Sequence, residues 1–183
     1  PVFLAGATER SIAVAGRMGC GLMLSSWTPF DELGRQTANY CKHLEETPPA
    51  LRTNPARGHA DVVRWTYVAE SDARAKRESE AGMMRHLQHF SSSHTSGYLG
   101  TVSDGGGTSK RDFDALNKDI ILHGSPASVI EKIERLRDMP GFRSVMLHYP
   151  PWYGYDKAMA SLELFAREVM PHFKTKAPAR LRA

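Results

Sequence analysis

The sequence predicts an α/β fold in which short parallel strands are covered by helices. Four apolar runs of strand length lack the alternation of polar and apolar residues that marks a half-exposed strand. Each run is followed by a stretch with helical periodicity, and a capping residue or a proline opens most of these stretches. Because the order strand then helix repeats along the chain, we expect one parallel sheet covered by helices.

Length and composition allow one sizeable hydrophobic core. The chain has 183 residues, 41% of them hydrophobic, so we expect one domain or part of one. Its 24 Lys and Arg against 20 Asp and Glu give a net charge of +4. Part of this excess lies in a basic tail over residues 174–183, which we expect to be frayed. No dense basic run interleaves with aromatic residues, so nucleic acid is not an expected partner.

Cysteine content and hydropathy indicate which cellular compartment to expect for the protein. Cys20 and Cys41 form no CxxC pair, which favours a reduced, cytoplasmic protein. No apolar run is long enough to span a bilayer, so no membrane association is expected. The chain opens directly on an apolar strand without an initiator Met, and we therefore expect it to be part of a longer protein, in which a targeting segment could precede Pro1.

The first unit passes from a strand at Val2–Leu4 into a helix opened by Thr8. Gly6 gives the turn, Thr8 is a good N-cap, and Ser11 lies in the first turn. Free backbone N–H groups, the positive end of the helix dipole and two hydroxyls would meet there, which makes a candidate anion site. The same residues also make an ordinary helix cap, and their spacing alone favours the cap.

The later units follow in order along the chain. A second strand is expected over residues 21–26, with a helix from Thr28-Pro29 to about Glu46. A proline-rich connection follows over residues 47–60. A third strand then covers Val62–Ala69, and Ser71-Asp72 caps a helix to about Phe90. A Ser/Gly-rich stretch over residues 91–112 is too long for a passive connection and predicts a mobile loop. We read Asp112, Asp114 and Asp119 as a loop followed by a turn.

The final units begin at Gly124-Ser125-Pro126, where a serine cap precedes a proline at the first helical position. That helix is expected to end at Pro140-Gly141, a fourth strand covers Ser144–Tyr149, and a last helix shows one apolar face as far as Phe173. Four units are too few for a closed eight-unit barrel. The pattern therefore leaves two architectures open, an open doubly wound domain or half of a barrel.

An ordered set of segments resembles the bacterial luciferase-like flavin monooxygenases. Its members are the opening unit with Thr8, Ser11 and residues 13–19, then residues 22–27, Gly124-Ser125-Pro126, residues 142–148 and residues 161–171. The resemblance implies the C-terminal half of a luciferase-like (β/α)8 TIM barrel over residues 1–173, with four strand–helix units. It also implies that residues 91–112 are the mobile active-site loop that closes over reduced flavin.

The same resemblance implies a function. Thr8 and Ser11 match hydroxyl positions that hold the FMN phosphate, beside the backbone of Ala7, where some relatives carry an acidic residue. The family implies a monooxygenase that uses reduced FMN, supplied by a separate flavin reductase, and molecular oxygen to oxidise a small organic substrate, usually as a homodimer. Its catalytic groups lie largely on the other half of the barrel, so the catalytic residues here are unknown and the chain alone is expected to be inactive.

Two other functions stay open. A deazaflavin-dependent oxidoreductase of the same fold would share the phosphate turn and move hydride without oxygen. A non-catalytic flavin-binding half-barrel would bind the cofactor without doing chemistry. FMN binding by this half alone would favour the binding module.

Further candidates lie where strands end. Ser25, Ser26 and Trp27 follow the second strand at the edge where barrel enzymes build their sites, and Ser25 and Trp27 are candidates to line the flavin. His148, Trp152 and Tyr153 follow the fourth strand and are candidate substrate-pocket residues, although loop packing or a contact with a partner chain explains such aromatics slightly better. His86, His89 and His94 lack metal-ligand spacing, so no metal is expected.

Overall fold

The structure is a computed structural model that describes residues 1–92 and 112–174. Every strand pair in it is parallel, and the strands are β1 (Phe3–Ala5), β2 (Gly21–Leu24), β3 (Ala60–Val68), β4 (Leu122–Gly124) and β5 (Phe142–His148). β1 pairs with β2 and β2 with β3, while β3 also pairs with β5 along its first two thirds and with β4 at its end. The predicted parallel sheet is therefore present, with β3 at its centre.

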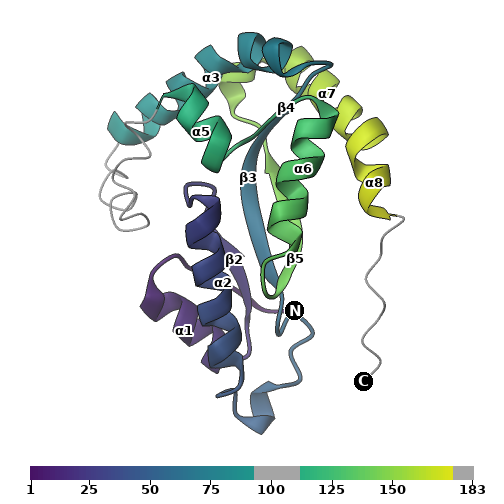
Figure 1. The fold of residues 1–183 in the computed structure, drawn as a ribbon. Coiled ribbons are helices and arrows are strands. Elements are labelled where there is room, and N and C mark those ends of the chain that lie inside the picture. The colour runs from purple at the N-terminus through teal and green to yellow at the C-terminus, as the bar shows by residue number, and fades with distance from the viewer. Residues whose placement is uncertain (93–111, 175–183) are drawn as a thin grey trace.

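Helices follow the strands as the capping pattern predicts. They are α1 (Glu9–Arg17), α2 (Phe30–Leu44), the short 3-10 turn η1 (Pro49–Leu51), α3 (Asp72–Ser92), α5 (Phe113–Asp119), α6 (Pro126–Arg137), the 3-10 turn η3 (Pro151–Tyr153), α7 (Tyr155–Leu164), the π-helical turn η4 (Phe165–Val169) and α8 (Met170–Lys174). Figure 1 shows β3 in the middle of the molecule, with α1 and α2 to one side and α6, α7 and α8 to the other.

The two faces of the sheet differ in how well they are covered. Strand residues of one face, such as Leu24, Val62 and Leu147, pack in one core cluster with residues of α1, α2 and α6. The opposite face carries Val63 and Met146, which are directly paired across β3 and β5, and Met146 is 37% exposed. Because side chains alternate along a strand, one face lies under helices and the other is half-exposed, as in a section of a barrel wall.

An irregularity in the pairing of β3 with β5 sets which residues share a face. Ala60 pairs with Phe142, but Asp61 pairs with Ser144, so Arg143 is an extra residue in β5. Because of this β-bulge, Ser144 lies on the same face of the sheet as Asp61. The Ser144 hydroxyl donates to the Asp61 carboxylate at 2.9 Å.

Two elements differ from the sequence prediction. The aspartates expected to form a loop and a turn belong to α5, whose N-cap Asp112 accepts a hydrogen bond from the Ala115 N–H at 2.8 Å, and whose Phe113 and Leu116 are buried. The strand β4 was not expected, because its apolar run directly follows α5 and only pairing with β3 distinguishes it. The predicted mobile loop lies almost entirely, and the predicted tail except for Lys174, outside the described residues.

Helices α1 and α2 pack closely through a glycine. A Cβ added to Gly16 of α1 would lie 2.7 Å from the His43 Cβ and 2.9 Å from the Tyr40 carbonyl oxygen of α2. Gly34 of α2, in contrast, has open space around its Cα. One glycine is thus required by helix contact, and the other is not.

We predict opposite effects for alanine at these two glycines. Gly16→Ala should lower the free energy of unfolding by about 1 kcal/mol or more, because the added methyl overpacks the contact. Gly34→Ala should raise it by up to about 1 kcal/mol, because alanine favours the helix. Urea unfolding followed by circular dichroism measures both changes. Equal stabilisation by the two substitutions would contradict the close contact.

Candidate functional site

The turn between β1 and α1 is a reciprocal helix cap. The Thr8 hydroxyl accepts the Ser11 N–H at 3.2 Å, and the Ser11 hydroxyl oxygen accepts the Thr8 N–H at 3.1 Å. The Ser11 hydroxyl in turn donates to the Thr8 carbonyl at 2.9 Å. Because the Ser11 hydrogen is used in this way, the Thr8 hydroxyl donates to the Ser11 hydroxyl oxygen, 3.0 Å away. The cap predicted from spacing is therefore present. It leaves the N–H groups of the first helical residues, Glu9 and Arg10, without an acceptor inside the helix.

Neighbouring residues fix the backbone of this turn. A Cβ on Gly6 would lie 2.6 Å from the Ser11 hydroxyl oxygen, so the close approach requires glycine. The Gln36 side chain of α2, which is 5% exposed, donates from Nε2 to the Ala7 carbonyl at 3.0 Å. Sequence reasoning did not find Gln36, because only the packing of α2 against α1 brings it to Ala7.

A second cap in the chain shows what such a turn binds. Ser125 and Ser128 open α6 with hydroxyls 3.0 Å apart, much as Thr8 and Ser11 open α1. At α6 the Asp72 carboxylate accepts the Ser125 N–H at 2.6 Å, and this bond is the main cause that lowers the pKa of Asp72. The α6 terminus is thus filled by an anion from the chain itself. No such carboxylate from a distant residue bonds the α1 turn in the described part of the chain, and Thr8 is exposed.

The turn after β2 is held by a buried arginine of β3. Arg64 donates from Nη1 to the Ser25 carbonyl at 2.9 Å and from Nη2 to the Thr28 carbonyl at 2.7 Å. Burial lowers its pKa to about 9, so the guanidinium stays charged at neutral pH. The Ser25 hydroxyl accepts the Trp27 N–H at 3.2 Å, which makes it a turn-forming group. Trp27 itself is buried.

Rings from several elements gather at the carboxyl ends of the strands. Trp27 packs edge-on against Trp65 of β3, with centroids 4.7 Å apart, and Trp65 lies 5.4 Å from the His86 ring of α3. His148 of β5 and Trp152 of η3 lie 5.6 and 5.3 Å from the same imidazole. We call these five residues the ring cluster. Ala7 packs against the core group that contains Trp27 and Trp65, so the α1 turn adjoins the ring cluster.

The imidazoles of the ring cluster are neutral at physiological pH. Burial, together with the nearby His148 and His89, lowers the pKa of His86 to about 4. Burial also lowers the pKa of His148. The cluster therefore presents aromatic and uncharged surface, although it contains two groups that can take up a proton. His86 was considered in the sequence only as a metal ligand, and its place beside the tryptophans follows from the fold.

Tyr153 lies beside the ring cluster but points into the interior. It is 4% exposed, and its hydroxyl lies 2.8 Å from Nε2 of His123, a buried residue of β4. The other ring nitrogen of His123 lies 2.8 Å from the Ser79 hydroxyl, which donates to the Ala75 carbonyl at 2.7 Å. Burial holds the pKa of His123 well below its usual value. His123 is therefore neutral, with Nδ1–H donating to Ser79 and Nε2 accepting from Tyr153.

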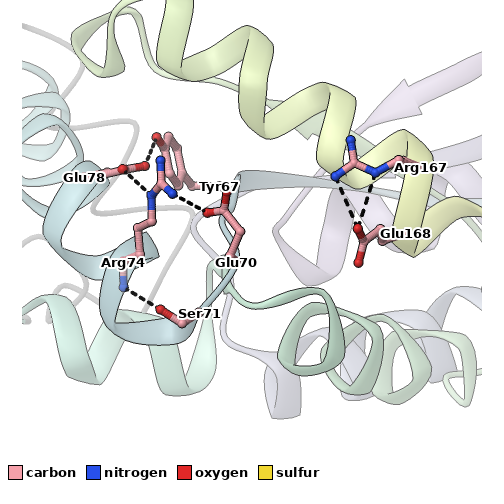
Figure 2. Close-up of polar contacts among 7 residues, drawn as sticks. All are labelled: Tyr67, Glu70, Ser71, Arg74, Glu78, Arg167 and Glu168. Atoms are coloured by element: carbon pink, nitrogen blue, oxygen red, sulfur yellow. Dashed lines mark hydrogen bonds and ion pairs between the residues drawn. The ribbon is translucent and has the colours of Figure 1, made fainter.

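An ionic network fixes the start of α3 above the end of β3. Figure 2 shows Arg74 between Glu70 and Glu78, at 2.8 and 2.7 Å, with the Tyr67 hydroxyl donating to the second oxygen of Glu78 at 2.9 Å. Burial, followed by the hydrogen bond to Glu78, raises the pKa of Tyr67. The same view shows a separate pair, Arg167 with Glu168, on η4. The network at β3 holds the helix that carries His86.

The described residues contain neither a group of metal-ligating side chains nor a membrane-spanning helix. Over residues 1–92 and 112–174, no three or more His, Cys, Asp or Glu side chains are grouped so that they could hold a metal ion. In the same ranges no helix combines the length and the apolar character that crossing a membrane requires.

Comparison with known proteins identifies the family. The model of the luciferase-like monooxygenases matches residues 1–143. The chain belongs to this family. It is 26% identical over 176 residues to limonene 1,2-monooxygenase of Rhodococcus erythropolis, a match that covers 92% of this chain and 42% of that protein. The chain thus spans less than half the length of this curated relative.

Solved structures show the fold. The oxygenating constituent of 3,6-diketocamphane monooxygenase of Pseudomonas putida, solved with FMN, aligns with a TM-score of 0.65 at 22% identity, over 93% of this chain and 48% of that one. The coenzyme F420-dependent tetrahydromethanopterin reductase of Methanopyrus kandleri aligns with a TM-score of 0.64 at 14% identity, over 94% and 51%. Each match covers about half of the known chain, which confirms the luciferase-like half-barrel and excludes the doubly wound alternative.

We predict that intrinsic fluorescence reports the protonation of His86. All three tryptophans of the chain, Trp27, Trp65 and Trp152, belong to the ring cluster, and a protonated imidazole quenches indole emission. Because burial opposes the charge, the emission should fall near pH 4 rather than near pH 6.5. His86→Gln should remove this step. A step that persists in the variant would contradict the assignment.

Proposed function

We propose that this chain is the flavin-binding half of a flavin-dependent monooxygenase that uses reduced FMN and molecular oxygen to oxidise a small organic substrate. The observation that carries the proposal is the α1 turn, a helix N-terminus that no carboxylate from a distant residue fills within the described part of the chain and that adjoins an uncharged ring cluster. FMN has both of the parts that this arrangement would bind: an anionic phosphate for the turn and a flat aromatic ring system for the ring cluster.

The residues present fit the phosphate end of FMN. The N–H groups of Glu9 and Arg10 are the donors, and the Thr8 hydroxyl would join them by turning away from the Ser11 hydroxyl oxygen. The Arg10 side chain is exposed at the same turn. Ser11 acts by holding Thr8 in place, since its own hydroxyl hydrogen is bonded to the Thr8 carbonyl. The Gln36 bond to Ala7 orients the peptide that leads into the turn.

The ring cluster would contribute orientation and water exclusion. When bound, the reduced flavin supplies the electrons for oxygen activation. Trp27 and the turn held by Arg64 are the candidates to contact the flavin, and His148 and Trp152 are the candidates to contact substrate. Tyr153 would act through its buried bond to His123, which anchors the turn that presents Trp152. The uncharged imidazoles favour an uncharged substrate.

A deazaflavin-dependent oxidoreductase is the second candidate. Its support is the fold shared with an F420-dependent reductase and with an F420-dependent secondary alcohol dehydrogenase, which aligns with a TM-score of 0.58. Delivery of reduced FMN by a separate reductase, a homodimer of complete barrels and a cytoplasmic location remain predictions of the family resemblance.

We predict that the α1 turn recognises the phosphate of FMN. With the other half of the barrel supplied, the protein should bind FMN more tightly than riboflavin, and Thr8→Ala should weaken FMN binding by about tenfold, equivalent to 1.4 kcal/mol, with riboflavin binding unchanged. Isothermal titration calorimetry measures the four affinities.

The matched control is Ser125→Ala, which removes the same kind of helix cap from α6. Both substitutions should cost about 1 kcal/mol of stability, but only Thr8→Ala should change FMN binding. Equal loss of FMN and riboflavin binding in Thr8→Ala would refute the phosphate role. Tight binding of F420 without binding of FMN would favour the deazaflavin enzyme.

A further inference from the structure

The buried cation of β3 has no counter-charge in the part of the chain that the structure describes. Arg64 is fully buried on the helix-covered face of β3, the face that also carries Val62. Burial alone lowers its pKa to about 9, and no acidic neighbour raises it. Of the two acidic residues that follow the turn it holds, Glu32 is bonded by Arg35 at 2.7 Å and Asp31 is exposed. The core therefore holds an uncompensated positive charge at neutral pH.

The hydrogen bonds of Arg64 satisfy only part of its guanidinium. Nη1 donates to the Ser25 and Val63 carbonyls at 2.9 and 3.0 Å, and Nη2 donates to the Thr28 carbonyl at 2.7 Å. Nε has no hydrogen-bond partner among the described residues, although it is buried. Carbonyl dipoles stabilise a cation but do not neutralise it, and burying a charge costs far more than burying a neutral amide. The shape of the turn by itself does not account for a full charge.

The guanidinium lies directly behind the turn that the proposed flavin site uses. The two turn carbonyls that it binds, of Ser25 and Thr28, lie on either side of Trp27, a member of the ring cluster. The α1 turn leaves the adjacent strand, since β1 pairs with β2 and the Gly6 N–H donates to a carbonyl of β2 at 3.2 Å. A cofactor whose phosphate lies at the α1 turn thus reaches the Trp27 turn with its ring system.

We propose that Arg64 makes this site select the reduced, anionic form of the flavin over the oxidised form. Oxidised flavin takes up two electrons and one proton to give a reduced form whose ring system carries one negative charge at neutral pH. The oxidised ring system is neutral, so only the reduced one supplies a counter-charge. Because the guanidinium is buried, water and salt screen its field much less than that of a surface charge. The inference rests on the proposed function, since it needs a flavin ring system at the turn after β2.

This role differs from that of the α1 turn. The phosphate of FMN has the same charge in both redox states, so Thr8 and the backbone donors beside it bind oxidised and reduced FMN equally well. Arg64 acts on the ring system instead, and the ring system is the part whose charge changes. The chain would therefore hold the cofactor with one turn and select its redox state through the next.

The experiment measures the midpoint potential of the bound flavin, with the other half of the barrel supplied. Titration with dithionite and a reference dye gives the ratio of the affinities for reduced and oxidised FMN, and a tenfold ratio equals about 30 mV for a two-electron couple. In the unchanged protein we expect reduced FMN to bind at least about tenfold more tightly. Arg64→Gln and Arg64→Met should each lower this ratio at least about tenfold, although only glutamine keeps a donor for the turn.

Matched controls separate the charge from the structure of the turn. Arg135→Gln removes the other guanidinium at the Phe30 ring, 4.7 Å from its centroid against 5.5 Å for Arg64, but Arg135 is exposed and the ratio should stay unchanged. Thr8→Ala should weaken the binding of both redox states by the same factor. Riboflavin should show the same preference as FMN in the unchanged protein, a measurement that does not depend on the folding of any variant.

Three results would overturn the inference. They are equal binding of the two redox states by the unchanged protein, a preference that persists in both folded Arg64 variants, and a preference for reduced FMN that riboflavin does not share. The proposed function fails separately from these three. If the unchanged protein binds FMN in neither redox state, the proposed function and the inference are both overturned.

Discussion

The nine-residue strand β3 is the constraint on which the structure depends. It pairs with β2, β4 and β5, so every strand except β1 is placed directly by it. Its Arg64 is buried without a carboxylate partner among the described residues and instead binds two carbonyls of the turn after β2. A charge buried in this way is costly unless its hydrogen bonds are made. The turn that carries Trp27 is therefore fixed by the strand rather than by its own sequence.

The parts of the fold that depend on residues close together in the sequence could be predicted. The α1 cap follows from Thr8 and Ser11 because both partners lie within one helical turn. The long strands follow from their apolar runs. The strand β4 and the helix α5 could not be predicted, because each is short and is stabilised by contacts with distant residues. The carboxylate of Asp72 at α6 depends in the same way on a contact across 53 positions.

The candidate site shows the same division. Sequence reasoning found the residues of the α1 turn and the aromatic residues after β5, since both lie at predicted strand ends. It did not find Gln36, Arg64 or His123, whose roles come from packing between elements far apart in the chain. It also could not tell that Trp152 lies against imidazoles while the adjacent Tyr153 is buried. These two neighbours in sequence have different surroundings because their side chains point in different directions from the 3-10 turn η3.

The extra residue in β5 has a consequence for the whole inner wall. Arg143 lies at the bulge. Each later residue of β5 therefore pairs with the β3 residue one position earlier than it would in an uninterrupted ladder. With an uninterrupted ladder, Leu147 would take the place of His148 opposite Trp65, and the imidazole would lie among the helices. The orientation of an entire strand, and with it the polarity of this part of the barrel lumen, thus rests on a single inserted residue at the far end from the ring cluster.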